Sequence, residues 1–184
     1  MIEELIYDLS KSPFSPPKNF AVAAEYERQN QSASAVSFYL RTAEFGRTSH
    51  PVLVYTSLIK LAHCFEDQND RMATVSNALL QAVSYEPGRR EAYFFLAQFC
   101  ERAKQWQECM TWTSLGLAQP EREPLPLDVG YKTYGLLFER AVCAYWLGRR
   151  DISRELFNHL LELDLAPEYR SSVEDNLRRL DAVL

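Results

Sequence analysis

The amino-acid sequence has no stretch that would hold it in a membrane. No apolar run approaches the roughly 18 residues that a membrane-spanning helix needs. The N-terminal region also lacks the basic stretch and uninterrupted apolar core of a secretory signal peptide. We therefore expect a cytoplasmic protein with no membrane partner.

An excess of positive charge is missing too. Lys and Arg total 20 against 25 Asp and Glu, which leaves a formal net charge of −5. Proteins that bind nucleic acids usually carry a basic surface, so we expect no nucleic-acid partner. Hydrophobic residues make up 47% of the chain, which is ordinary for a folded protein, so a membrane protein or a disordered chain is not favoured.

Cysteine is sparse, and no two cysteines have a paired spacing. A zinc knuckle needs two close cysteines, and a small secreted domain needs a higher density of them for its disulfides. The four cysteines lie singly in helix-like stretches. We interpret them as small buried apolar side chains: Cys64, Cys100, Cys109 and Cys143.

Complete catalytic motifs are also missing. No Asp-x-Asp pair is present to hold the cation of a metal-dependent sugar transferase. Gly130 and Gly135 have the spacing of a phosphate-binding loop, but leucines follow where Lys and Ser or Thr are required. His63 and Cys64 are adjacent, so on a helix their side chains diverge by roughly 100° and cannot act together as base and nucleophile. We expect no enzymatic activity, no cofactor and no metal.

The sequence does contain an internal repeat. A helical pattern in which large residues precede a small one occurs four times, and a second helical pattern follows each about a dozen residues later. The small residues are 38, 35 and 44 positions apart: Ala24, Ala62, Ala97 and Ala141. Polar or turn residues separate the two patterns at Asn30–Ser32, Asp67–Asp70, Lys104–Gln105 and Gly148–Asp151. This self-similarity predicts stacked helical hairpins.

The predicted fold is all-α, a right-handed α-solenoid of about four helical hairpins over residues 18–164. The hairpins are expected at residues 18–46, 51–86, 89–119 and 131–164. Each hairpin has an apolar stripe that it cannot bury alone, so burial requires stacking on its neighbours.

Three segments lie outside these hairpins. Residues 1–17 predict a short N-terminal helix and a proline-rich extended arm. Residues 167–184 predict a C-terminal capping helix whose apolar face carries Val173, Leu177, Leu180 and Leu184. Prolines and a glycine in residues 119–130 predict a long loop, which is either a lid or an insertion.

The third hairpin resembles a tetratricopeptide repeat (TPR). Tyr93, Leu96 and Ala97 match the aromatic, leucine and small residue of that family's first helix, and Gly148 matches its turn glycine in the fourth hairpin. The sequence departs from the family where other residues replace its usual Tyr, Gly, Ala, Phe and Ala: Cys100, Lys104, Cys109, Thr113 and Gly116. The resemblance covers residues 18–164 and implies a TPR-like solenoid with a concave groove.

A second similarity concerns the segments Pro87–Ala97, Tyr134–Glu139 and Ala144–Gly148, together with Trp106 and Trp112. These residues are similar to TPR-like helical regions that accompany family-2 glycosyltransferases, including viral ones. The similarity implies an accessory helical piece beside a catalytic domain carried by a separate chain.

The TPR resemblance also implies which residues line the concave groove. In that family, the first helix of each hairpin faces the groove, and the partner is a protein or peptide segment. Carried onto this sequence, the groove positions are Glu25, Arg28, Lys60, His63, Phe94, Gln98, Arg102, Phe138 and Tyr145. Such a surface suits a partner that has both charges and an apolar anchor.

We therefore hypothesise a non-catalytic protein–protein interaction scaffold or adaptor that holds a partner protein or peptide in the groove. One alternative is an accessory subunit of a glycosyltransferase that contributes acceptor recognition. Another is a self-assembling structural protein, a homodimer in which the N-terminal arm with Phe14 lies in the groove of a second copy.

Overall fold

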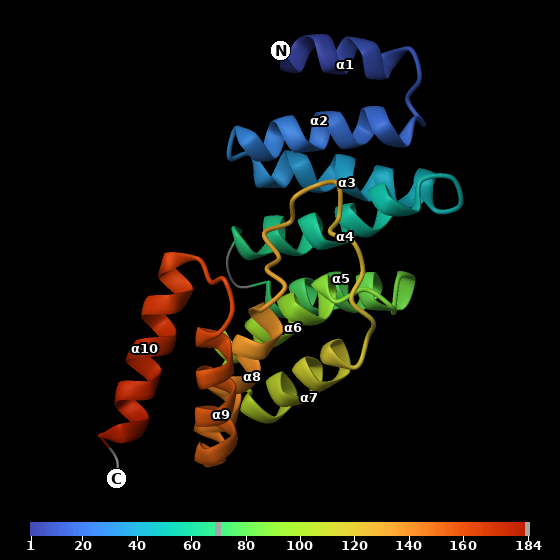
Figure 1. The fold of residues 1–184 in the computed structure, drawn as a ribbon. Helices are drawn as coiled ribbons and strands as arrows, with labels where there is room; N and C mark the ends of the chain where they lie inside the picture. The colour runs from blue at the N-terminus through green and yellow to red at the C-terminus, as the bar shows by residue number, and fades with distance from the viewer. Residues whose placement is uncertain (69–70, 183–184) are drawn as a thin grey trace. The chain divides into compact units, whose positions relative to one another are not determined.

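The computed structural model describes residues 1–68 and 71–182, and within these ranges it contains ten α-helices and no β-strand (Figure 1). The predicted all-α fold of helical hairpins is confirmed. The chain forms two compact units. Unit 1 consists of Met1–Pro87 with Glu123–Val129, and unit 2 consists of Gly88–Arg122 with the chain from Gly130 onward. Asn69, Asp70 and Leu184, which we assigned to a turn and to the capping helix, lie outside the described residues.

Unit 1 has a short N-terminal helix followed by two helical hairpins. Its helices are α1 (Ile2–Ser10), α2 (Pro16–Arg28), α3 (Ser32–Gly46), α4 (Pro51–Glu66) and α5 (Met72–Tyr85). Figure 1 shows these helices, coloured blue to green, lying one beside the next. The first helices of the two hairpins, α2 and α4, also contact each other, and this contact brings their side chains to a common face.

Unit 2 also has two helical hairpins, and these are followed by a final helix. Its helices are α6 (Glu91–Arg102), α7 (Trp106–Leu117), α8 (Gly135–Trp146), α9 (Arg150–Leu161) and α10 (Pro167–Asp181). Here α6 and α8, the first helices of the two hairpins, contact each other as α2 and α4 do in unit 1. The two units are therefore built on the same local arrangement.

Three hairpin turns share one backbone conformation. Asn30, Lys104 and Gly148 have φ of 57°, 57° and 74°, the left-handed region that lets the chain leave a helix and reverse. In each turn, the N–H of the next residue donates to the carbonyl five positions earlier at 2.8–2.9 Å, which satisfies a carbonyl at the helix end. Glycine and asparagine adopt this conformation readily, whereas lysine does so at a cost.

Small residues let the helices of unit 1 approach closely. One alanine in each of α2 to α5 is no more than 1% exposed: Ala23, Ala35, Ala62 and Ala82. Large side chains fill the space between the helices, and those no more than 2% exposed include Tyr39, Tyr55, Ile59, Leu61 and Leu79. This alternation of small and large residues gives the hairpins complementary surfaces.

The C-terminal helix closes the core of unit 2. Phe157 and Leu160 of α9 form one cluster with Val173 and Leu180 of α10, all no more than 2% exposed, and Leu177 packs against it. The prediction that Val173, Leu177 and Leu180 share an apolar face is confirmed. A polar outer face on a terminal helix is what a repeat protein needs at its end.

The proline-rich arm is shorter than the sequence predicts. Pro16 and Pro17 begin α2, because the first turn of a helix needs no N–H donor and proline already has a helical φ. The side-chain amide of Asn19, which is buried, donates to the carbonyls of Pro13 and Ser15 at 3.0 and 2.9 Å and ties the short connection to α2. Phe14 is 71% exposed, although its ring contacts Phe45 edge to face.

Two of the four cysteines form a disulfide, which corrects part of our interpretation of all four as small buried apolar side chains: this pair is buried but bonded. Cys109 of α7 and Cys143 of α8 are bonded, with Cα atoms 6.5 Å apart. Cys64 and Cys100 are free and buried, as expected. The disulfide pair is 34 positions apart in sequence, and only the packing of α7 on α8 brings the two thiols together.

Candidate functional site

The repeat register in the first hairpin differs by one residue from the sequence prediction. Counting back seven positions from the left-handed turn residue gives Ala97 from Lys104 and Ala141 from Gly148, as predicted, but Ala23 from Asn30. Ala23 is fully buried, whereas Ala24 is half-buried. The small residue of the first hairpin is therefore Ala23, and the positions assigned by counting from Ala24 move back by one.

This shift explains where Glu25 lies. In the corrected register Glu25 is equivalent to Cys64, Phe99 and Cys143, which are all buried. Glu25 itself is only 8% exposed and accepts two hydrogen bonds from the guanidinium of Arg28, at 2.9 and 2.7 Å. Arg28 and then the side-chain amide of Gln29 hold the pKa of Glu25 at about 2. Glu25 thus anchors Arg28.

The positions that replace Glu25 and Arg28 in the corrected register are Ala24 and Glu27, and both line a groove in unit 1. We call it the unit-1 groove; its volume is about 440 Å³. Its lining residues come from α2, α3, α4 and the turn after α2, and from the irregular segment after α7: Phe20, Ala24, Glu27, Arg28, Asn30, Tyr39, Lys60, Leu127 and Asp128. Of the nine predicted site residues, the structure brings Arg28 and Lys60 together here.

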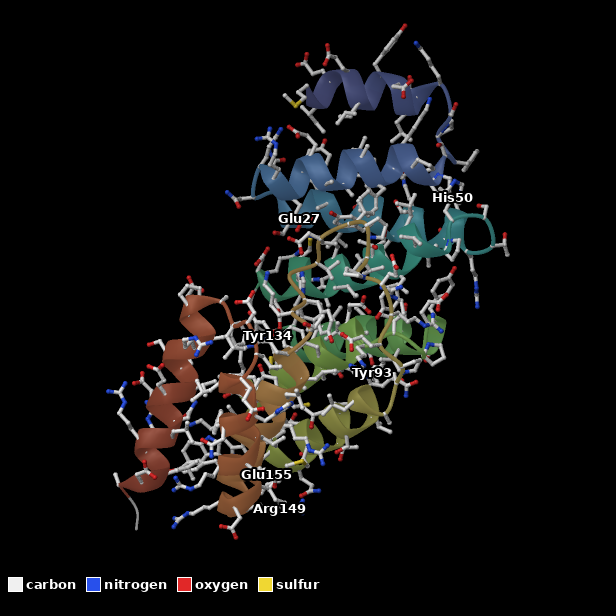
Figure 2. All side chains as sticks on the ribbon, viewed as in Figure 1. Glu27, His50, Tyr93, Tyr134, Arg149 and Glu155 are labelled. Carbon is white, nitrogen blue, oxygen red and sulfur yellow. A yellow bond between two sulfur atoms is a disulfide. The ribbon has the colours of Figure 1, made fainter. Side chains whose placement is uncertain are left out.

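Glu27 is the centre of a polar cluster in this groove. The ammonium of Lys60 donates to Glu27 Oε1 at 2.9 Å, and the hydroxyl of Tyr39 donates to Glu27 Oε2. These side chains come from α4, α2 and α3, so the cluster joins both hairpins of unit 1. Figure 2 shows Glu27 near the end of α2. Burial, and then the bond to Glu27, raises the pKa of the Tyr39 phenol far above its usual range, so Tyr39 stays a donor.

The groove also has an aromatic and apolar side. The rings of Phe20 and Tyr39 meet edge to face with centroids 5.5 Å apart, and Ala24 on α2 leaves room beside them. Both Glu27 and Lys60 keep part of their surface, at 28% and 21% exposed, while Arg28 is 65% exposed. The groove therefore offers an apolar floor, a paired charge and an outer cation.

In unit 2 the side chains at the equivalent positions pack against other residues of the same unit. Phe94 is 1% exposed; its ring contacts those of Phe95 and Tyr131, and it lies so close to Gly135 that a Cβ there would come within 2.5 Å of the ring. Phe138 is half-buried between Phe157 and Tyr169, with centroid distances of 6.0 and 5.1 Å. These two rings are core contacts of unit 2.

The remaining predicted residues lie apart from the unit-1 groove lining. His63 of α4 is half-buried, and Arg102 at the end of α6 is exposed. Tyr145 is half-buried and meets Trp146 edge to face. Gln98 of α6 is half-buried and hydrogen-bonds Glu139 of α8, a carboxyl group that is only 5% exposed. Burial raises the pKa of Glu139 to about 7.

Sequence reasoning missed Phe20, Glu27 and Tyr39 as groove residues. A signal for the first two was present: with Ala23 in place of Ala24 as the small residue, Phe20 falls at the position of Phe94 and Phe138. Tyr39 lies on the second helix of its hairpin, which the family geometry does not assign to the groove. Leu127 and Asp128 belong to the long loop, and no local pattern predicts where a loop packs.

We searched the described residues for groups that could bind a metal ion or react as a free thiolate. Within residues 1–68 and 71–182, no three His, Cys, Asp or Glu side chains come together as a metal site requires. Burial raises the pKa of the Cys64 thiol to about 12 and that of Cys100 to about 11, which keeps both protonated and unreactive. Nor is any helix in the described part of the chain long and apolar enough to cross a membrane.

Comparison with known proteins gives matches in structure but not in sequence. No family model matches the chain, and no curated protein matches it. The structure is similar to that of MamA, with a TM-score of 0.68 and 13% identity over 88% of this chain and 85% of MamA. It is also similar to PilF of Pseudomonas aeruginosa, with a TM-score of 0.67 and 11% identity over 94% of this chain and 72% of PilF.

A third match is a thermophilic TPR protein from Thermus thermophilus, with a TM-score of 0.63 and 15% identity over 96% of this chain and 88% of that protein. These matches lend no support to the link with family-2 glycosyltransferases or with viral proteins. The similarity extends over most of the chain, and it agrees with the paired helices and left-handed turns described above. The chain therefore has the fold of the tetratricopeptide-repeat proteins.

Proposed function

We propose that this chain is a non-catalytic interaction scaffold that holds a segment of a partner protein in the unit-1 groove. The observation that carries the proposal is the groove itself, in which an apolar floor, a Glu27–Lys60 pair and an outer Arg28 lie side by side on α2 and α4. Rigid helices position each of these groups before a partner arrives, so binding costs little conformational entropy.

The groove chemistry suits a non-helical segment that carries an apolar side chain beside a carboxylate. The apolar side chain would cover Phe20 and Ala24, and the carboxylate would approach Arg28 or Lys60. Charge pairs at an interface contribute mainly to specificity and to the rate of association, while the buried apolar contact contributes more of the affinity.

The test is a selection from a displayed library of random peptides against the purified chain. We expect peptides whose binding is weakened at least tenfold by Ala24→Gln, which fills the floor of the groove, and by Arg28→Glu, which reverses the outer charge. Arg41→Glu is the matched control, since Arg41 is exposed on α3 outside the groove lining. If the selected peptides bind all variants with equal affinity, the unit-1 groove is not their binding site and the proposal is wrong.

The other predictions about partners and location stay predictions. No contact among the described residues favours an accessory subunit of a glycosyltransferase over a simple scaffold. The self-assembly alternative needs the N-terminal arm, in which Phe14 is exposed, and light scattering of a variant lacking residues 1–17 would test it. Cytoplasmic location and the absence of nucleic-acid binding are likewise inferred from the sequence alone.

A further inference from the structure

The loop between α7 and α8 contributes a segment to unit 1. Residues Glu123–Val129 cluster with the helices of unit 1, although the chain before and after them belongs to unit 2. In Figure 1 this segment, coloured gold, crosses in front of α3. Leu127 and Asp128 line the unit-1 groove together with Phe20, Ala24 and Lys60. One wall of the groove is therefore made by a segment with no helical structure.

Burial alternates along this segment. Leu125 and Leu127 are half-buried and Val129 is only 6% exposed, whereas Pro124, Pro126 and Asp128 between them are exposed. Such an alternation is typical of a non-helical chain that lays one side against a surface. The prolines keep Glu123 and Leu125 out of the helical region and reduce the freedom that the segment loses when it packs.

These observations concern the same groove that we assign to the partner, so the inference rests on the proposed function. We propose that residues 123–129, which form one wall of the unit-1 groove, act as an internal ligand of the face made by α2 and α4, and that a partner segment must displace them to bind. Because the segment is joined to the protein at both ends, its effective concentration at the groove is high. A free partner segment of similar intrinsic affinity therefore binds weakly until the internal segment leaves.

The internal segment also indicates the chemistry of the partner. It presents Leu125 and Leu127 on either side of Pro126, followed by Asp128, which lines the groove together with Arg28 and Lys60. The partner is accordingly a non-helical, proline-containing segment with two apolar side chains in alternation and a carboxylate after them. This is the chemistry that the apolar floor and the outer cation of the groove accept.

The experiment measures binding of a fluorescent peptide that has the sequence of residues 121–130 of this chain. Fluorescence anisotropy is recorded with the wild-type chain and with two opened variants. In one, Leu125→Ser and Leu127→Ser remove the apolar contacts of the segment. In the other, residues 123–129 are replaced by a Gly/Ser linker of the same length. Leu115→Ser is the matched control, since Leu115 is exposed on α7.

We expect both opened variants to bind the peptide at least tenfold more tightly than the wild-type chain and the Leu115→Ser control do. The apparent affinity of the wild type is reduced by the fraction of molecules whose groove is open. Adding Ala24→Gln to an opened variant should abolish the gain. A peptide in which both leucines are replaced by serine should bind none of the variants.

Two results would overturn the inference: equal affinity for wild-type and opened chains, or no binding of the peptide to either opened variant. Failure of the proposed function is recognised separately, by repeating the display selection on an opened variant. If that selection yields peptides sensitive to Ala24→Gln while the segment peptide does not bind, the groove binds partners but residues 123–129 do not mimic them. If it yields no such peptides, the groove proposal itself fails.

Discussion

Glu139 should make the stability of this protein depend on pH. Its side chain is 5% exposed on α8, and burial raises its pKa to about 7, although a hydrogen bond from Gln98 favours the ionised form. In the unfolded chain the pKa of the same carboxyl group is close to its ordinary value of 4.5. Below pH 4.5 the carboxyl group is protonated in both states and does not change the free energy of unfolding. Above pH 7 it must ionise inside the folded protein, which lowers the free energy of unfolding.

The size of the effect follows from the two pKa values. A difference of one pKa unit corresponds to 1.36 kcal/mol, so a group raised from 4.5 to about 7 lowers the free energy of unfolding by about 3 kcal/mol at pH 8. The loss develops between pH 4.5 and 7, where the folded state binds more protons than the unfolded state. Glu139→Gln keeps the shape and the polar group but does not titrate.

We would measure urea unfolding by circular dichroism from pH 4.5 to 8 for the wild type, Glu139→Gln and Glu155→Gln. Glu155 is an exposed residue on α9 and serves as the matched control (Figure 2). The stability of Glu139→Gln relative to the wild type should rise by about 3 kcal/mol between pH 4.5 and 8. A relative stability that does not change with pH, or one that changes as much for the control, would refute the reasoning.

Three further predictions concern packing, turns and the disulfide. Gly116→Ala should lower the melting temperature, because the new Cβ would lie 2.8 Å from Tyr93 Cβ, and such overpacking costs about 1–3 kcal/mol; an unchanged melting temperature would contradict this. Lys104→Gly should raise the melting temperature by about 2–4 °C, since it removes the backbone strain of about 1 kcal/mol that a lysine has in the left-handed conformation. Gly148→Ala, with nothing within 4 Å of the new Cβ, should lower it by a similar amount; calorimetry showing the opposite signs would be decisive against the turn argument. Titration of the denatured, non-reduced chain should find the two thiols of Cys64 and Cys100, and reduction should destabilise the protein by about 3–4 kcal/mol for a loop of this length; four thiols before reduction would rule the disulfide out.

The hairpins were predictable because their signals are local. Apolar periodicity gives the helices, and the polar breaks at Asn30, Lys104 and Gly148 coincide with the left-handed turns. The departure at Lys104 shows that a turn can keep its backbone conformation when the residue type changes, at the cost of strain. Local patterns of this kind depend on residues within one or two helical turns of each other, which a single sequence displays directly.

The candidate site was only partly predictable. Arg28 and Lys60 line the unit-1 groove, but Glu25 is buried, because Ala23 and not Ala24 is the small residue of the first hairpin. Two adjacent alanines satisfy the same pattern, and a shift of one residue rotates a helix position by roughly 100°. Only the burial of Ala23 and the position of the Asn30 turn settle which one faces the neighbouring helix.

By itself the sequence determined an all-α chain of paired helices, where most of its turns fall, and the apolar face of its last helix. The tertiary structure decided which aromatic rings are core, that Cys109 meets Cys143, and that residues 123–129 pack on unit 1. The physical reason is the distance along the chain over which each feature is specified. Helices and turns follow from neighbouring residues, whereas a disulfide, a buried ring such as Phe94 and a packed loop depend on contacts between residues that many positions separate.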